Sequence, residues 1–228
     1  MEIVIATNNH IKYADIISQT IDRSAEERGT GIAKRTPEYI QAKIRNANAV
    51  IALDGDKFAG FCYIETFSNK NYVVHSGLIV DNNYRKKGLA KKIKTKVFNY
   101  SKQKYPGAKI FGITTGLAVM KINYELGYKP VTFSEITDDP EFWKGCQSCK
   151  NYDVLQRTEQ KMCLCTGMMY DPDHEQGIKD HPYNSKTLRR LKRIKQSLFL
   201  KKKDKKNKNN KNTLLPLFYW SKDQNSKR

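Results

Sequence analysis

The stretch Arg85-Lys86-Lys87-Gly88-Leu89-Ala90 follows an apolar run at 77–80 and a polar turn at 81–84, and it opens a segment with helical spacing, residues 89–104. A strand, a basic glycine loop and a helix N-terminus, in this order, are what a phosphate-binding element requires. First-turn N–H groups have no intrahelical partner, and the helix dipole favours an anion there. Gly88 lets the backbone approach a phosphate, and the cations supply charge and donors. The alternative is a surface turn before an ordinary basic helix.

Two motifs in this region resemble those of the GNAT N-acetyltransferase superfamily. The pattern Val80-x-x-x-Tyr84-Arg85-x-x-Gly88-x-Ala90 is similar to the family's acyl-CoA pyrophosphate loop, Arg/Gln-x-x-Gly-x-Gly/Ala. About 35 residues later, the run Asn123-Tyr124-Glu125-Leu126-Gly127-Tyr128 resembles the family's "Tyr-x-x-Leu-Gly-Phe" helix end. The resemblance covers about residues 1–135, with 136–172 as an extension of the same domain. It implies an α/β fold with a mixed, mostly antiparallel sheet flanked by helices.

The resemblance also implies acetyl-CoA, or another acyl-CoA, as the donor. The strand before the loop is expected to splay from its neighbour so that pantetheine can insert, and a backbone N–H of this strand is expected to polarise the thioester carbonyl. The residues implied for CoA binding are Leu78, Ile79, Val80, Arg85, Lys86, Lys87, Gly88, Leu89, Ala90 and Asn123.

The spacing of apolar residues and the turn residues predict the order of the elements. Thr36 followed by Pro37 indicates a helix start, with Thr36 as N-cap. Asp54-Gly55-Asp56 indicates a hairpin turn. Strands are expected at 3–6, 49–53, 57–67, 72–80, 109–114, 129–134 and 166–170, and helices at 10–27, from 37, at 89–104 and at 117–126.

Charge and length indicate a domain followed by a basic tail. The chain has 228 residues and a net charge of +19, of which residues 181–228 contribute +14 through 16 Lys and Arg against 2 Asp and Glu. We expect a GNAT domain at 1–172, with a Cys-rich insertion at about 136–165, and a basic, largely disordered C-terminal extension at 173–228. Apolar residues at helical spacing predict a basic amphipathic helix at 187–200. The tail is either a solvated appendage or a nonspecific contact for nucleic acid or another acidic surface.

The sequence predicts no membrane span, because it has no run of eighteen apolar residues. It begins with a strand pattern and not with a charged and then apolar leader, so a cytoplasmic location is expected. In that compartment its five cysteines are expected to be thiols or metal ligands. The oligomeric state is not readable from the sequence.

Four of the cysteines form two close pairs, Cys146-x-x-Cys149 and Cys163-x-Cys165, separated by thirteen residues. Two such pairs can converge on a tetrahedral structural Zn²⁺. The alternatives are buried unligated thiols, a reversible disulfide or a catalytic dithiol. The zinc hypothesis is that the metal pins an insertion between the last two sheet strands. The fifth cysteine, Cys62, is expected to be a core residue.

Acyl transfer to an amine needs a base for the ammonium and an acid for the thiolate. Candidate bases are Glu65 and His75, which lie on strands that the family uses for acceptor contacts. The family's acid is a tyrosine five residues before the aromatic of the second motif, and that position here is Asn123. The neighbouring Tyr124 is turned by about 100° on a helix and cannot simply inherit the role. Both Asn123 and Tyr124 stay candidates.

The first interhelical loop, residues 28–35, walls the acceptor site in the family and is rich in cations and glycine here. It is either a solvated basic loop or a site for a carboxylate-bearing acceptor such as an amino acid. The runs 29–35, 111–120 and 142–146 are similar to a Bacteroidetes group of GNAT proteins associated with arginine biosynthesis loci, which implies glutamate or a relative as acceptor. The residues expected to contact the acceptor are Arg28, Lys34, Arg35, Thr114 and Thr115.

These observations predict an N-acyltransferase, most simply an N-acetyltransferase, that acts on a small-molecule primary amine by direct attack. No covalent enzyme intermediate is invoked, because no Cys-His nucleophile pair is evident. The alternative is a non-catalytic module with a GNAT-like fold that binds CoA or nucleic acid.

Overall fold

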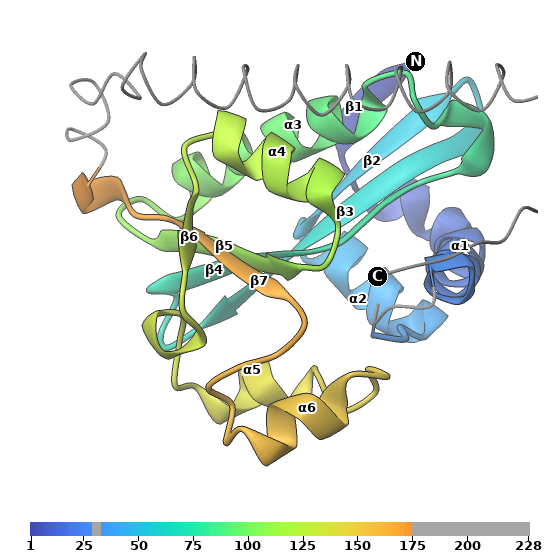
Figure 1. The fold of residues 1–228 in the computed structure, drawn as a ribbon. Coiled ribbons are helices and arrows are strands. Elements are labelled where there is room, and N and C mark those ends of the chain that lie inside the picture. Colours follow the sequence, from blue (N-terminus) through green and yellow to red (C-terminus); the bar gives the residue numbers. More distant parts are fainter. Residues whose placement is uncertain (29–32, 175–228) are drawn as a thin grey trace, which may run out of the picture. The chain divides into compact units, whose positions relative to one another are not determined.

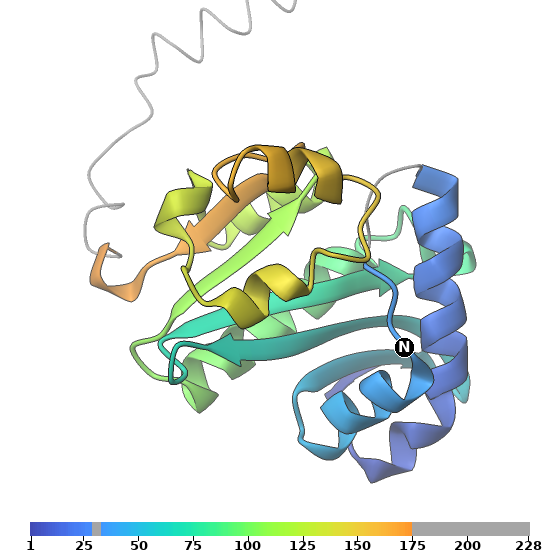
Figure 2. The ribbon, with the colours of Figure 1, turned by 90° about the horizontal axis from the view of Figure 1, so that it is seen from below.

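A seven-stranded mixed sheet organises the computed structural model, which describes residues 1–28 and 33–174 (Figures 1 and 2). The strand order is β1-β2-β3-β4-β5-β7-β6, and every neighbouring pair is antiparallel except β4–β5. The strands are β1 (Glu2–Ile5), β2 (Ala49–Asp54), β3 (Lys57–Phe67), β4 (Tyr72–Val80), β5 (Lys109–Thr114), β6 (Lys129–Val131) and β7 (Thr166–Tyr170).

Helices cover both faces of the sheet (Figure 1). On one face lie α3 and α4, which pack on a core that includes Cys62, Ile93 and Tyr128. The other face is shared by α1 and α2, over the β1–β4 side, and by α5 and α6, over the β5–β7 side. The helices are α1 (Ala14–Arg28), α2 (Pro37–Arg45), α3 (Leu89–Lys104), α4 (Leu117–Glu125), α5 (Pro140–Lys144) and α6 (Tyr152–Arg157), with 3₁₀ turns at Asn8–Tyr13, Asn82–Tyr84 and Phe133–Glu135.

The predicted α/β fold, a mixed and mostly antiparallel sheet flanked by helices, is confirmed, and the elements follow the predicted order. Thr36 caps α2 as expected, since its side chain accepts a hydrogen bond from the Tyr39 N–H at 3.3 Å. Two boundaries differ by more than one residue. The first helix begins with a 3₁₀ turn before α1, and the strand expected at 129–134 ends at Val131, because Thr132 caps the turn that follows.

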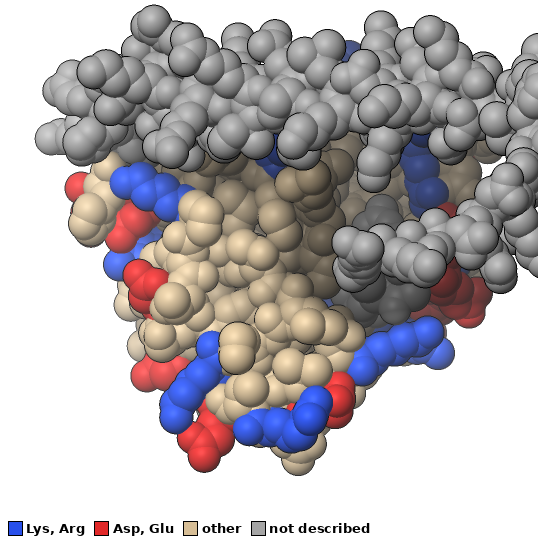
Figure 3. Space-filling model, in the orientation of Figure 1, with Lys and Arg blue, Asp and Glu red and all other residues tan. Residues whose placement is uncertain are grey.

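The Cys-rich segment that contains α5 and α6 lies between β6 and β7 in the chain, and the final strand occupies the predicted residues 166–170. The domain boundaries stay a prediction, and the amphipathic helix expected at 187–200 lies outside the described residues. Within the described part of the chain, no helix is both long and apolar enough to cross a membrane. The face seen in Figure 3 is largely uncharged over its middle, with charged side chains mainly at its borders.

The parallel pair β4–β5 holds together only at one end. Its register joins residues 72–74 of β4 to residues 109–111 of β5, and the two strands then diverge. Residues 75–80 of β4 pair with β3, where a register shift places an extra residue on β4 near Gly77. Gly77 has φ +61°, and a Cβ there would lie 2.4 Å from the Tyr63 ring. The splayed strand expected from the sequence is therefore present, and the bulge at Gly77 bends it.

Candidate active site

A cavity of about 470 Å³ opens where β4 and β5 diverge. Its lining comes from both faces of the sheet: α1, α2 and the α5–α6 segment on one face, and α3 and α4 on the other. Leu78 of β4, Lys94 of α3 and Asn123 of α4 line the same space as Arg35 and Glu65. The gap in the sheet therefore joins two chemically different walls.

The basic loop enters α3 in the geometry that an anion site requires. Gly88 is the N-cap of α3 with φ +75°, and no side chain caps the first turn of this 16-residue helix. A Cβ built on Gly88 meets no atom within 4 Å, so open space lies beside the loop. Lys86 also adopts a left-handed conformation, with φ +63°. The free first-turn N–H groups, with the loop's cations, suit a phosphate.

Arg85 is held by the protein itself. Its Nη1 donates to Glu27 Oε2 at 2.9 Å, its Nη2 to Ser24 Oγ at 3.2 Å, and its Nε to the Val80 carbonyl at 3.2 Å. Hydrogen bonds from Asn82 and from Arg85 lower the pKa of the Glu27 carboxyl. Arg85 therefore ties the loop to α1, and two of its five guanidinium donors are left over.

His75 points to the α3 side of the sheet and is 7% exposed. Its Nε2 hydrogen-bonds with Ser101 Oγ at 2.9 Å, and its Nδ1 with the Tyr128 hydroxyl at 3.0 Å. Burial, and then the charge of Lys94, hold the pKa of His75 well below its ordinary value. Because both ring nitrogens are engaged in the core, this geometry favours a structural role for His75 over the base role expected from the sequence.

Asn123 and Tyr124 face different sides of α4. Asn123 is 1% exposed and lines the cavity, and its Oδ1 is buried without a hydrogen-bond partner in the described structure. Its Nδ2 reaches only the Met168 Sδ, at 3.8 Å. Tyr124 is 58% exposed. The one-residue shift read from the sequence thus directs the tyrosine away from the cavity.

Glu65 of β3 lies on the opposite wall, within a cluster of aromatic and charged side chains. Its Oε1 accepts a short hydrogen bond from the Tyr39 hydroxyl and pairs with Lys43 Nζ at 3.4 Å. Burial is the largest cause that raises the pKa of Tyr39, to which Tyr63 and Glu65 add. Glu65 and Tyr39 both line the cavity.

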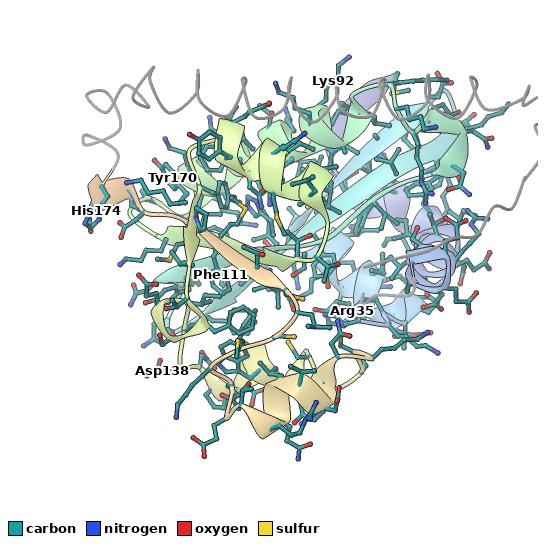
Figure 4. All side chains as sticks on the ribbon, viewed as in Figure 1. Arg35, Lys92, Phe111, Asp138, Tyr170 and His174 are labelled. Atoms are coloured by element: carbon teal, nitrogen blue, oxygen red, sulfur yellow. The ribbon has the colours of Figure 1, made fainter. Side chains whose placement is uncertain are left out.

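Arg35 completes this wall and lies at the gap between α2 and the α5–α6 segment (Figure 4). Its Nε donates to the Tyr63 hydroxyl at 2.6 Å, and its guanidinium carbon lies 5.1 Å from the centre of the Tyr39 ring. Nη1 donates to the Lys34 carbonyl, and no described residue accepts a hydrogen bond from Nη2. A Cβ on Gly145 would lie 3.9 Å from Nη2. Arg35 is thus oriented by aromatic rings and keeps donors for a ligand.

The other predicted acceptor residues are spread more widely. Thr114 and Thr115 line the cavity at the end of β5, and the Thr114 Oγ1 accepts from the Gly116 N–H at 3.0 Å. Lys34 is exposed and outside the cavity lining, and Arg28 ends α1. The structure therefore brings Arg35 and the two threonines to one cavity but does not bring Lys34 there.

The structure does not support the predicted zinc site. All four cysteines line the cavity, yet among the described residues no group of three or more His, Cys, Asp and Glu side chains is arranged to hold a metal ion. Burial and the neighbouring thiols raise the pKa of Cys146 to about 11 and that of Cys165 to about 12. The insertion is held on the sheet by aromatic packing instead, with Phe142 edge-on to Phe111 at 5.0 Å between ring centroids. Cys62 is a buried core thiol, as predicted.

Sequence reasoning missed Lys94, which is 2% exposed and lines the cavity. The segment around it reads Lys91-Lys92-Ile93-Lys94-Thr95-Lys96, so composition does not single out one lysine. Helical spacing does carry a signal, because Lys94 lies four residues before Phe98 and seven before Ser101, which are both buried. A lysine at helical spacing from apolar residues, on the side of the helix that packs on the core, is the sequence feature that could have revealed Lys94.

Comparison with known proteins agrees with this geometry. A family model described as the acetyltransferase (GNAT) family matches residues 19–121. No curated protein matches the chain. Among solved structures, N-acetylglutamate synthase from Neisseria gonorrhoeae, complexed with coenzyme A and N-acetyl-glutamate, is similar at 15% identity and a TM-score of 0.54. The match covers 75% of this chain but only 34% of that one, so the chain spans about a third of the Neisseria enzyme.

Two further structures are matched over nearly their whole length. Rv2747 from Mycobacterium tuberculosis, in complex with CoA and NLQ, has 13% identity and a TM-score of 0.55, and the ribosomal-protein-alanine N-acetyltransferase from Brucella melitensis has 12% and 0.51. Each match covers 75% of this chain and 99% of the other. At these identities the likeness establishes the fold. Together with the family model matched over residues 19–121, it shows that the described part of the chain has the fold of the GNAT acetyltransferases.

Proposed function

We propose that the protein transfers an acyl group, most simply acetyl, from acyl-CoA to the amino group of a small acceptor. The acceptor carries a carboxylate and is glutamate or a related amino acid. The observation that carries this proposal is the cavity at the β4–β5 gap, with Arg35 on one wall, together with the loop after β4 that leads into α3 without a side-chain cap. The Neisseria enzyme, which is complexed with CoA and N-acetyl-glutamate, supports it by likeness of fold. The association with arginine biosynthesis loci stays a prediction.

The donor end of the site is the loop from Arg85 to Ala90. The backbone N–H groups at the start of α3 would bind the pyrophosphate, while Arg85, fixed by Glu27, keeps the loop in shape. Beyond the loop, residues 75–80 of β4 have no strand partner on their β5 side in the described sheet. This open edge supplies the backbone groups to which the pantetheine arm and the thioester carbonyl would hydrogen-bond.

The acceptor end is the wall that contains Arg35. A guanidinium binds a carboxylate with two parallel hydrogen bonds, which are stronger than neutral ones. Arg35 is held in place by Tyr63 and Tyr39, so little side-chain freedom is lost when a ligand binds. The carboxylate of an amino acid on Arg35 would leave its amino group free to reach the gap between the strands.

Glu65 is the base in this proposal. It lies on the same wall as Arg35, and its carboxylate could take a proton from the acceptor ammonium, with Tyr39 fixing its orientation. The neutral amine then attacks the thioester carbonyl directly. His75 is not needed in this scheme, since its ring is bonded to Ser101 and Tyr128.

The test is a panel of acyl-CoA donors and free amino acids, with thiol release as the readout. Turnover is expected with acetyl-CoA and at least one carboxylate-bearing amine. CoA binding without turnover on any amine would contradict the proposal and would favour a non-catalytic binding module.

The donor site has its own test in Gly88→Val, because a side chain there would fill the space beside the loop. Gly107→Val is the matched control, since Gly107 also has a positive φ, +80°, and open surroundings. Both variants carry similar backbone strain, so a shared fall in melting temperature is expected. Only Gly88→Val should lose CoA affinity, by about 10²-fold if two or three charge-assisted hydrogen bonds are lost. Equal affinities in both variants would mean that CoA does not use this loop.

A further inference from the structure

Lys94 is a buried cation at the cavity, and no acidic side chain among the described residues pairs with it. It lies on α3, is 2% exposed, and lines the same cavity as Leu78 and Asn123. Its Nζ lies 5.2 Å from the centre of the Tyr128 ring. A lysine is almost never this buried unless it is paired. A position that could be filled by an apolar side chain therefore holds an ammonium at the edge of the β4–β5 gap.

The groups that face Lys94 are weak partners for a positive charge. They are the Cys62 thiol on β3, the His75 imidazole on β4 and the Tyr128 ring. Burial lowers the pKa of Lys94 to about 8, and the Cys62 thiol offsets this shift only in part. Such a group is protonated at neutral pH but gives up its proton far more readily than an ordinary lysine.

The reaction lacks an acid at the place where the family resemblance expects one. Tyr124 is 58% exposed and faces away from the cavity, and the Asn123 amide has no acidic proton. The unpartnered Oδ1 of Asn123 lies in the same buried pocket that Lys94 lines. We propose that Lys94 is the general acid that protonates the CoA sulfur, while Asn123 helps to orient the reacting group beside it. This inference rests on the proposed acyl transfer.

Atoms and charge are conserved in the proposed acyl transfer. The neutral amine attacks the thioester carbonyl, forming the C–N bond, and the C–S bond breaks with its electron pair leaving on sulfur. The Lys94 ammonium gives one proton to that sulfur, which yields the CoA thiol and a neutral lysine. The base on the acceptor wall first passes the ammonium proton to solvent and then takes one further proton from the amine nitrogen. Solvent then restores the proton on Lys94 and removes the one on the base, so no oxidant or reductant is needed.

The first experiment titrates the thiol of bound CoA and needs no acceptor. Thiolate absorbance is followed against pH for CoA bound to the wild type, to Lys94→Met and to Lys96→Met. A neighbouring ammonium lowers a thiol pKa by about one unit or more. The bound thiol should therefore ionise at lower pH in the wild type and in Lys96→Met than in Lys94→Met. Lys96 is exposed on the same helix, so it controls for the charge removed.

The titration distinguishes failure of the Lys94 proposal from failure of the proposed CoA site. Failure of the wild type to bind CoA would overturn the donor site itself. CoA bound with the same thiol pKa in all three proteins would overturn the role of Lys94 alone. Methionine is similar in length and apolar, and replacing a buried charge in this way is usually neutral or stabilising, so Lys94→Met is expected to fold.

Kinetics supply the second readout. With an acceptor that the wild type acylates, kcat should be about 10²-fold lower in Lys94→Met. The wild-type kcat should decrease at alkaline pH as Lys94 loses its proton, and this decrease should be absent in Lys94→Met. An unchanged kcat and pH profile would show that Lys94 is only a core residue. Mass spectrometry of wild type incubated with acetyl-CoA gives a further check, because a stoichiometrically acetylated Lys94 would make it a nucleophile and overturn the acid role.

Discussion

The two walls of the cavity use polar residues in opposite ways. On the α2 wall, Arg35 and Glu65 are charged and held in place: Arg35 donates to Tyr63, and Glu65 accepts from Tyr39 and pairs with Lys43. On the α3 wall, Lys94 and Asn123 are almost fully buried, and each keeps a polar group without a strong partner. Fixed charges suit the binding of a charged molecule, whereas a poorly compensated group in an apolar setting suits the transfer of a proton.

The sheet explains how one fold supplies both environments. Alternate residues of a strand face opposite sides, so neighbouring residues of β3 and β4 contribute to different walls. Tyr63 and Glu65 face α2, while Cys62 packs on the α3 side. The two walls meet only because β4 and β5 part after residues 74 and 111. Without that gap the charged wall and the buried wall would be separated by the sheet.

The largest effect is expected from Glu65→Gln, which removes the base of the α2 wall but keeps its shape. Loss of a positioned base lowers kcat by about 10²–10⁴-fold. CoA affinity should not change, since it depends on the loop before α3. Steady-state kinetics and CoA binding check both points, with the exposed Glu26→Gln as control for the lost charge. A Glu65→Gln enzyme with full kcat would remove the base from this wall.

Next in size is Gly77→Ala, which tests the bend that opens the gap. Gly77 and Gly55 have similar φ values, +61° and +59°, but only at Gly77 would a Cβ clash, at 2.4 Å from Tyr63. Backbone strain and overpacking together should lower the free energy of unfolding by about 3 kcal/mol in Gly77→Ala. Gly55→Ala carries strain alone and should lose about 1 kcal/mol. Equal losses in denaturant titrations would show that the Tyr63 contact does not constrain the bulge.

The sequence alone could predict the fold and the donor loop because both depend on local signals. Helix spacing, the Thr36–Pro37 start and the Gly88 loop are contiguous in the chain, and each survives in the structure. The walls of the cavity depend on contacts between distant segments. Arg35 meets Tyr63 across 28 residues, and no local pattern indicates that pairing.

Two sequence hypotheses, the base role of His75 and the zinc site, depend on how side chains pack. His75 lies on a strand that contacts acceptors in the family, but the strand face that it occupies is turned to α3 and Ser101. The cysteine spacing suggested zinc, yet the insertion is held by Phe142 and its aromatic neighbours. Both hypotheses depend on side-chain direction, which a single sequence does not fix.

A smaller effect is expected from Arg35→Gln. Removing one charge-assisted carboxylate contact costs about 2 kcal/mol, or about 30-fold in kcat/KM for the acceptor. Arg45→Gln removes the same charge from the exposed surface of α2, where Arg45 contacts only Gln41 among the described residues, and should change kcat/KM by less than about twofold. For amines that lack a carboxylate, both variants should change kcat/KM equally little. A loss that is the same for all amines would mean that Arg35 does not recognise the carboxylate.

The smallest effect concerns His75, whose pKa is well below 6.5 in the folded protein. Below pH 6.5 the unfolded state binds a proton that the folded state does not, so stability falls as pH falls. Between pH 7.5 and 5.5 this group should remove about 1.4 kcal/mol from the free energy of unfolding. Urea titrations at the two pH values, in the wild type and in His75→Gln, isolate the contribution. An identical pH dependence in both proteins would mean that His75 ionises freely in the fold.

The central claim is that the thioester lies in the β4–β5 gap, with its sulfur on the α3 wall and its carbonyl open to the α2 wall. A crystal structure of the wild-type protein with CoA tests it most directly. We expect the pyrophosphate at the Gly88 turn and the CoA sulfur between Leu78 and Asn123, within hydrogen-bond reach of Lys94 Nζ. A sulfur atom on the other side of the sheet from Lys94, or a pantetheine arm outside the gap, would contradict it.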